Sequence, residues 1–252
     1  MPIADIARRA LPLLDLTDLS DTCTEAAIET LCQKAVTPFG TVAAVCLYPP
    51  FVAQAKTLLH GSGVKIATVV NFPDGGDDTV AVEHETAAAI GNGADEIDLV
   101  MPYRAFLAGR HGFAETQIVR IRRVCGPVTL KVILETGRLA LPEPIREASD
   151  LALSAGADFI KTSTGKVEVN ATPEAARIML AAIRASGRAA GFKAAGGVRS
   201  AAEAGAYLQL ADEIMGPDWA TPATFRFGAS ALLANLIGEI EGSAASSATQ
   251  AY

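Results

Sequence analysis

The chain has 252 residues, half of them hydrophobic, and its 21 Lys and Arg against 28 Asp and Glu give a formal charge of −7. The charged fraction of 19% is below the ~25% usual for soluble domains, so the composition predicts a globular chain with a large core. A pI near 5.0 argues against a protein that binds nucleic acid over a broad surface, while a small basic pocket for an anion is compatible with it.

The N-terminal region and the cysteines indicate a cytoplasmic protein without a membrane partner. Asp5 and Arg8 interrupt the N-terminus before any long apolar run, so we expect no signal peptide. The longest uncharged stretch, 35–55, contains prolines and therefore cannot form one membrane helix. Four cysteines, at positions 23, 32, 46 and 125, have neither metal-ligand nor redox-motif spacing and are too few for a disulfide framework.

Eight β-rich runs alternate with Ala-rich stretches that carry helix-start signals, such as Thr172-Pro173 and the capping-box pattern of Ser200 and Glu203. Most runs are apolar throughout, as is typical of parallel strands covered on both faces. One strand per about 31 residues matches a βα repeat that closes into a barrel. We therefore predict an α/β fold: a single (β/α)8 TIM barrel over 1–241, with a short N-terminal helix and a flexible tail of small polar residues over 242–252. The expected strands are Leu13–Thr17, Val42–Tyr48, Ile66–Phe72, Glu96–Met101, Val128–Glu135, Phe159–Ser163, Gly191–Ala195 and Thr224–Phe227.

An internal echo places two charged residues in one register. Residues 93–98 and 156–161 share the pattern Gly-Ala-Asp-x-Ile-x, which ends one helix and begins the next strand. Asp98 and Lys161 occupy the same position of this pattern, 63 residues or about two βα units apart. Alternate strands of such a barrel place side chains in the same interior layer. The spacing therefore predicts that this carboxylate and this amine face each other inside the barrel.

Lys161 and Lys193 are 32 residues apart and should project from neighbouring strands. Two close ammonium groups repel, so one should lose its proton easily and become a nucleophile toward carbonyls. The alternative is that each lysine only pairs with a carboxylate in the core. Lys131 and Glu135, on one strand at an even spacing, are expected to face each other in a supporting polar network.

Glycine-containing turns follow the last three strands and indicate an anion site. Thr164-Gly165-Lys166, Gly196-Gly197 and Gly228-Ala229-Ser230 each lie between a strand and the next helix. Backbone N–H groups of such turns can bind one phosphate, and this fold commonly binds phosphate at these late loops.

Taken together, these segments resemble the 2-deoxyribose-5-phosphate aldolases, Schiff-base aldolases built on a (β/α)8 barrel. The run Phe159–Gly165, Phe-Ile-Lys-Thr-Ser-Thr-Gly, is the most specific part. The matching segments span nearly the whole chain in order: Leu14–Thr17, Asn71–Pro73, Gly93–Asp98, Lys131–Gly137, Phe159–Gly165, Gly191–Lys193 and Arg226–Ser230.

The resemblance implies that Lys161 forms an imine with acetaldehyde, that Lys193 holds the charge that depresses the proton affinity of Lys161, and that Asp98 manages protons. The enamine adds to D-glyceraldehyde 3-phosphate to give 2-deoxy-D-ribose 5-phosphate, and catabolism of deoxyribose phosphate runs this reaction backwards. No metal or other cofactor is implied, because the protonated imine is the electron sink. The other residues implied at the substrate are Asp15, Thr17, Gly165, Lys166, Gly196, Gly197, Gly228 and Ser230.

Two turn positions depart from the family pattern. Ala194 follows Lys193 where relatives often have proline, and Ala231 follows Ser230 where relatives often have a second serine. The turn at Ala194 is expected to be looser and the turn at Ala231 to lose a hydroxyl contact. The C-terminal Tyr252 is either a disordered end or, as in some relatives, a residue that reaches the active site and assists proton transfer. Cys46 is either a small buried hydrophobe or a thiol at the pocket mouth.

Three functions are compared. The favoured one is a Schiff-base aldolase acting on a phosphorylated sugar and acetaldehyde, assembled as a homodimer. A metal-assisted aldolase or isomerase with Asp98 and Glu135 as ligands is disfavoured, because such sites usually recruit histidine or clustered carboxylates. A non-catalytic sugar-phosphate-binding protein is compatible with the fold alone.

Overall fold

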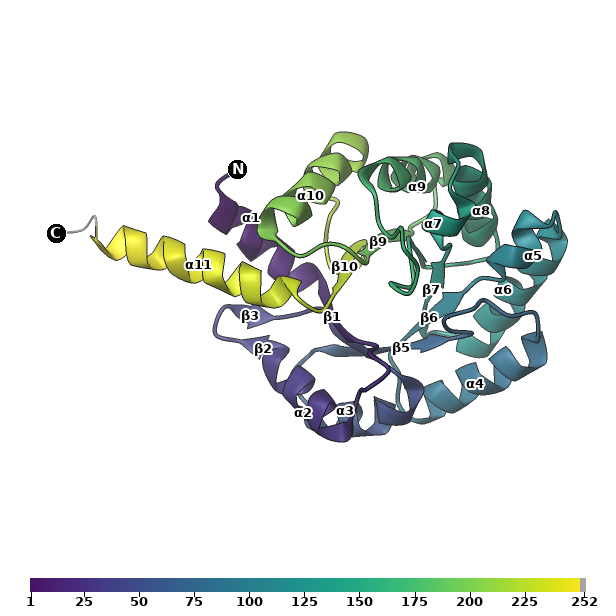
Figure 1. Cartoon of the computed structure of the whole chain (residues 1–252), viewed down its shortest axis with the longest axis horizontal. Helices are drawn as coiled ribbons and strands as arrows, with labels where there is room; N and C mark the ends of the chain where they lie inside the picture. The colour runs from purple at the N-terminus through teal and green to yellow at the C-terminus, as the bar shows by residue number, and fades with distance from the viewer. Residues whose placement is uncertain (250–252) are drawn as a thin grey trace.

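Eight parallel strands close into a barrel, and helices surround it, as the sequence predicts (Figure 1). The computed structural model describes residues 1–249, with side chains described through residue 242. Around the barrel the strand order is β1-β10-β9-β8-β7-β6-β5-β4, so each strand lies beside its neighbour in the chain and β10 closes onto β1. The strands are β1 (Leu14–Asp18), β4 (Ala44–Leu47), β5 (Lys65–Val70), β6 (Glu96–Val100), β7 (Thr129–Ile133), β8 (Phe159–Lys161), β9 (Gly191–Ala195) and β10 (Phe225–Ala229).

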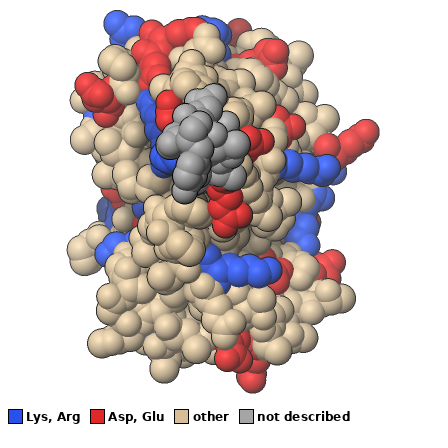
Figure 2. Space-filling model, turned by 90° about the vertical axis from the view of Figure 1, so that its left-hand side faces the viewer, with Lys and Arg blue, Asp and Glu red and all other residues tan. Residues whose placement is uncertain are grey.

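The expected short N-terminal helix, α1 (Ile3–Ala10), packs beside α10 and α11 and buries Ala4, Ala7 and Ala10 (Figure 1). On the side of the molecule that Figure 2 shows, acidic and basic side chains are interspersed. Arg9 of α1 pairs with Asp212 of α10 at 2.5 Å. The remaining helices are α2 (Glu25–Lys34), α3 (Val52–Leu58), α4 (Thr79–Gly91), α5 (Tyr103–Leu107), α6 (His111–Cys125), α7 (Thr136–Leu139), α8 (Pro142–Ser154), α9 (Pro173–Ser186), α10 (Ala201–Met215) and α11 (Leu232–Thr249), with 3-10 turns η1 (Leu11–Leu13) and η2 (Pro49–Phe51). In the described part of the chain, 1–249, no helix is long and apolar enough to cross a membrane.

The structure differs from the expected elements at the ends of some strands and helices. A short hairpin, β2 (Val36–Thr37) with β3 (Gly40–Thr41), was not expected. The last helix continues past the expected boundary at 242 and ends at Thr249, because the Ala-rich stretch after Gly242 is compatible with helix. Residues 250–252, the rest of the expected tail, lie outside the described part.

Local signals in the sequence form the expected caps. Thr172 accepts a hydrogen bond from the Ala175 N–H, and Ser200 and Glu203 form a complete capping box at α10. In both Gly-Ala-Asp repeats the aspartate carboxylate accepts a hydrogen bond from a backbone N–H of the neighbouring strand. Asp95 accepts from the Ile66 N–H on β5, and Asp158 accepts from the Leu130 N–H on β7. These contacts fix where β6 and β8 begin, and therefore the depth at which Asp98 and Lys161 lie in the barrel.

Candidate active site

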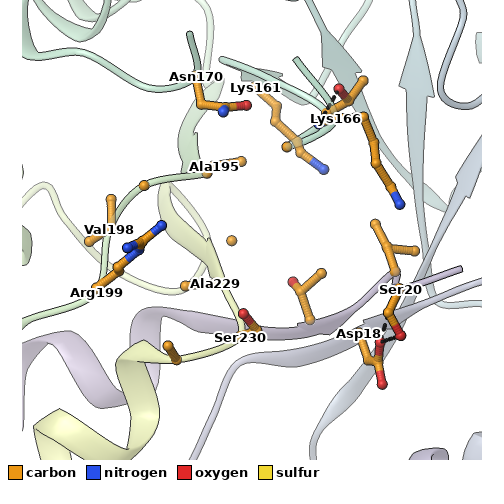
Figure 3. A pocket seen from close by; sticks show the side chains of 18 residues that line it. Asp18, Ser20, Lys161, Lys166, Asn170, Ala195, Val198, Arg199, Ala229 and Ser230 are labelled. Atoms are coloured by element: carbon orange, nitrogen blue, oxygen red, sulfur yellow. Dashed lines mark hydrogen bonds between the residues drawn. The ribbon is translucent and has the colours of Figure 1, made fainter. Parts of the chain in front are cut away.

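A pocket of about 380 Å³ opens at the carboxyl ends of the barrel strands, where enzymes of this fold carry their active sites (Figure 3). It brings together most of the predicted site residues, because the late turns converge on it. Three further residues border the pocket and were not predicted: Asn170, Val198 and Arg199. The sequence could have indicated Val198 and Arg199, because they directly follow the Gly196-Gly197 pair. The predicted residues that line the pocket are Thr17, Lys161, Gly165, Lys166, Gly196, Gly197, Gly228 and Ser230.

Beneath this pocket, seven charged side chains form a buried network inside the barrel, which we call the interior charge cluster. Every member is at most 5% exposed. Burial of charge is costly unless the groups are paired, and each member here has at least one partner of opposite sign. The cluster consists of Asp15, Glu96, Asp98, Lys131, Lys161, Lys193 and Arg226.

Asp98 is the centre of the interior charge cluster. Its Oδ2 accepts hydrogen bonds from Lys161 Nζ and Lys193 Nζ, both at 2.8 Å, and its Oδ1 accepts from Lys131 Nζ at 2.8 Å. The predicted contact between Asp98 on β6 and Lys161 on β8 is therefore confirmed. Lys161 and Lys193 are register partners on adjacent strands and contact the same carboxylate oxygen.

Lys193 is the lysine of this pair that the surroundings keep charged. Burial alone would lower its pKa, but the carboxylates of Asp15 and Asp98 outweigh that effect and raise the pKa above its ordinary value. For Asp98, burial would raise the pKa, yet Lys131, Lys161 and Lys193 hold it well below the usual range. Lys193 is fully buried, whereas Lys161 is 3% exposed and lines the pocket, so the two lysines differ in access to a ligand.

Asp15 lies deeper than the resemblance implied. Its carboxylate does not border the pocket; it accepts from Lys193 Nζ and from Arg226 Nη1, both at 2.5 Å. Thr17, two residues further along β1, does line the pocket, and its hydroxyl donates to the Asp15 carbonyl at 2.8 Å. Asp15 therefore contributes to the interior charge cluster and Thr17 to the pocket wall.

Lys131 and Glu135 do not face each other, contrary to expectation. Lys131 Nζ contacts Glu96 at 2.6 Å and Asp98 at 2.8 Å inside the barrel. Glu135 lies beyond the end of β7 with a left-handed backbone, φ 59°, and its carboxylate accepts from Thr164 instead. The even-spacing argument fails because the strand ends at Ile133 and the alternation of side chains ends with it.

Glu96 and Arg226 are members of the interior charge cluster that the sequence reasoning missed. Arg226 Nη2 donates to Glu96 Oε1 at 2.8 Å across the barrel. A signal existed, since Arg226 is the one charged residue of an otherwise apolar strand, and Glu96 stands two positions before Asp98 on the same strand face. Their partners could not be inferred, because β6 and β10 are not adjacent in the sheet.

Of the two roles considered for Cys46, the structure supports the small buried hydrophobe and not a thiol at the pocket mouth. Its side chain packs inside the barrel with Leu19 and Ala67 and is fully buried. Burial raises the pKa of its thiol. All four cysteines are unpaired. Tyr252, the remaining predicted site residue, lies outside the described residues.

The two acids considered as metal ligands, Asp98 and Glu135, do not suit a metal ion. Both oxygens of Asp98 are taken by ammonium groups, and Glu135 is directed to Thr164. Within residues 1–249, where side chains are described through 242, no group of three His, Cys, Asp or Glu is arranged to hold a metal. The donor set therefore disfavours the metal-assisted alternative.

Comparison with known proteins agrees with this geometry. Residues 9–236 match the model of the DeoC/LacD family of aldolases. The deoxyribose-phosphate aldolase of Agrobacterium fabrum (strain C58) is 53% identical over 250 residues, which cover 98% of this chain and 96% of the relative. The apo-form crystal structure of a proposed deoxyribose-phosphate aldolase from Toxoplasma gondii ME49 has a TM-score of 0.88 at 28% identity, covering 95% of this chain and 97% of that one. The deoxyribose phosphate aldolase of Aeropyrum pernix, whose structure is tetrameric, shares the fold at a TM-score of 0.76 and 24% identity, covering 95% of this chain and 92% of that one.

These matches, with the barrel and its pocket, define the class: the chain belongs to the DeoC/LacD family of aldolases. Within that class, the relatives reported above carry the name deoxyribose-phosphate aldolase, which confirms the resemblance found in the sequence.

Proposed function

We propose that this enzyme cleaves 2-deoxy-D-ribose 5-phosphate reversibly into D-glyceraldehyde 3-phosphate and acetaldehyde through a Schiff base on Lys161. One observation carries the proposal: Lys161 lines the pocket and at the same time contacts the buried Asp98. An amine so placed can meet a carbonyl in the pocket while its protons exchange with a group shielded from solvent.

The charge count of the interior charge cluster favours a reactive amine. Three carboxylates face four basic groups there. With Lys161 as a neutral amine, the cluster carries no net charge, whereas a protonated Lys161 adds one uncompensated buried charge. Lys193, held protonated by Asp15 and Asp98, supplies the positive charge that disfavours a second ammonium beside it.

The proposed reaction begins with attack of Lys161 Nζ on the aldehyde carbon C1 of the open-chain sugar. The carbinolamine loses water to give a protonated imine. The C2–C3 bond then breaks, its electron pair forms the enamine, and the C3 hydroxyl gives up its proton as D-glyceraldehyde 3-phosphate departs. The enamine carbon takes up a proton, and water hydrolyses the imine to acetaldehyde and free Lys161. Asp98, which contacts Lys161 and Lys193 through one oxygen, is the proposed route for protons in the carbinolamine and enamine steps.

The phosphate group is proposed to lie against the glycine turns. Gly165, Gly196 and Gly197 have positive φ angles of 86°, 82° and 90°, which other residues adopt only at a cost. Lys166 and Ser230 also line the pocket, with Ser230 two residues before α11 begins at Leu232, and α10 begins at Ala201 after the Gly196-Gly197 turn. Helix N-termini and lysine both favour an anion. Ala231 also borders the pocket, so the hydroxyl of a second serine is lost there.

Reductive trapping tests the proposal. Borohydride reduction in the presence of acetaldehyde should leave a two-carbon adduct on Lys161, which peptide mass spectrometry locates. Lys161→Leu should remain folded, show no adduct and lose turnover by the several orders of magnitude that separate covalent catalysis from its absence. Sugar-phosphate binding by the wild type without any adduct would instead support a non-catalytic binding protein.

Further parts of the proposal concern the setting of the enzyme. Deoxyribose phosphate catabolism in the cytoplasm is the proposed role, and the four unpaired cysteines are compatible with a reducing compartment. A homodimer is the proposed assembly, which sedimentation equilibrium measures directly.

A further inference from the structure

Glu135 is a buried acid that the proposed chemistry does not use. It follows β7, is fully buried and has a left-handed backbone, a conformation that costs free energy for residues other than glycine. Its Oε2 accepts from the Thr164 hydroxyl at 2.5 Å and its Oε1 accepts from the Thr164 N–H at 3.3 Å. Burial raises the pKa of this carboxyl, while the two Thr164 hydrogen bonds oppose the rise. Both carboxylate oxygens are thus committed to one residue of the β8–α9 loop.

Thr164 passes this constraint to the phosphate turn. Its hydroxyl donates to Glu135 and accepts from the Lys166 N–H at 3.0 Å, so the hydroxyl has one orientation. Gly165 between them has the positive φ that the turn requires. Thr164, Gly165 and Lys166 all line the pocket. A carboxylate outside the pocket therefore fixes three consecutive residues of its wall.

Two neighbours of Glu135 hold the same loop at its two ends. The Thr136 N–H donates to the Thr162 carbonyl at 2.9 Å, at the start of the β8–α9 loop. Gly137 packs so closely on the end of the loop that an added Cβ would lie 1.9 Å from the Val169 carbonyl oxygen. The strained turn after β7 thus contacts the loop at its start, middle and end.

We infer that Glu135 is a positioning residue that holds Thr164–Lys166 in the shape that binds the substrate phosphate, and so sets the preference for a phosphorylated over an unphosphorylated sugar. The inference rests on the phosphate site proposed above. It adds a residue that contacts no substrate and acts through Thr164.

Steady-state kinetics on two substrates tests this role. Glu135→Ala leaves the buried N–H and hydroxyl of Thr164 without their acceptor, so we expect KM for 2-deoxyribose 5-phosphate to rise at least tenfold. We expect kcat to stay within twofold of wild type and kcat/KM for unphosphorylated 2-deoxyribose to be unchanged. These two results would assign the rise in KM to the phosphate turn. An equal loss on both substrates would instead place the action of Glu135 at Lys161 and overturn the inference.

Three further variants separate positioning from stability and from charge. Glu135→Gln retains an acceptor for the Thr164 N–H and a donor for its hydroxyl oxygen, so KM should return to within about threefold of wild type. Glu168→Gln removes an exposed acid from the same loop and should leave KM unchanged. If Glu135→Ala does not fold, Thr164→Val removes the same link from its other end with little change in shape and should reproduce the rise in KM; an unchanged KM there contradicts the inference.

Calorimetric titration with inorganic phosphate distinguishes this inference from the proposed reaction. Wild-type protein that binds phosphate, with Kd raised about tenfold in Glu135→Ala, supports the inference even if the sugar phosphate is not cleaved. An active wild type whose phosphate affinity and KM survive Glu135→Ala overturns the inference alone. A wild type that binds no phosphate overturns both the inference and the phosphate site.

Discussion

At the scale of single residues, Lys161 and Lys193 differ in whether the pocket reaches them and not in residue type. Lys161 and Lys193 are the same residue type, lie in register and contact one oxygen of Asp98. Lys193 also contacts Asp15 and is closed off from solvent, while Lys161 opens to the pocket. The same ion-pair network thus provides a fixed cation and, next to it, an amine that a substrate can reach.

Replacing Lys193 by Leu tests the fixed cation. The change leaves Asp15 and Asp98 each without one buried partner, so the free energy of unfolding should fall by about 3–5 kcal/mol. Turnover at neutral pH should drop, and the rising, acid-side limb of its pH profile should move to higher pH, because the buried cation that repels a second ammonium group beside it is gone. Urea unfolding and the pH dependence of kcat/KM measure both effects.

Lys56→Leu is the matched control, because Lys56 pairs with Asp95 at 2.8 Å with half of its side chain exposed. A solvent-exposed pair contributes about 0–1 kcal/mol, so stability should change little. A Lys193→Leu enzyme with the rate and pH profile of wild type would contradict the repulsion argument.

At the scale of elements, two loops on different sides of the pocket meet through an ion pair. Asp21, after β1, contacts Lys166 Nζ, after β8, at 2.7 Å. With the phosphate site proposed above, Asp21 would compete with the substrate phosphate for the Lys166 ammonium group. The Asp21 side chain is 88% exposed, so solvent screens the pair and its strength is at most about 1 kcal/mol.

Asp21→Asn should release Lys166 and lower KM for the phosphorylated sugar about two- to threefold, with kcat unchanged. The difference should shrink as ionic strength rises, because added salt screens exposed charges. Asp150→Asn on α8 removes an exposed acid paired with Arg146 and should have no effect. A KM that stays equal to wild type at low salt would show that Asp21 does not compete with phosphate.

The sequence predicted elements and registers better than partners and strand ends. The Gly-Ala-Asp repeat placed Asp98 and Lys161 together because the capping aspartates set the start of both strands. The strand expected to run to Glu135 ends at Ile133, since no apolar pattern shows that the backbone turns left-handed there. The contact between Glu96 and Arg226 could not be predicted from the sequence either, because barrel closure determines which distant side chains meet in the interior.

At the scale of the whole molecule, the C-terminal residue tests whether the end of the chain takes part in the reaction. Deleting Tyr252 should lower turnover and leave the Tm nearly unchanged, as the resemblance implies a role in proton transfer at the enamine carbon. Tyr252→Phe separates the phenol oxygen from the ring and should lose as much turnover as the deletion. Steady-state assays measure the turnover and thermal unfolding measures the Tm. Full activity in the deletion variant would show that Tyr252 has no part in turnover.

The barrel interior should also determine how the whole molecule responds to acid. The fold holds the pKa of Asp15 and of Asp98 below the ordinary value, whereas in the unfolded chain these carboxyls take up protons near pH ~3.9. Their contribution to stability is therefore complete above that pH and is lost as the pH falls toward the folded pKa values, at about 1.4 kcal/mol per pH unit for each carboxyl. Urea unfolding between pH 6 and pH 3 should show a flat upper range and a steep fall below about pH 4. Asp74→Asn, which removes an exposed partner of Arg104, should leave the curve unchanged. An unfolding free energy that stays level down to pH 3 would mean that the surrounding lysines do not hold Asp15 and Asp98 ionised.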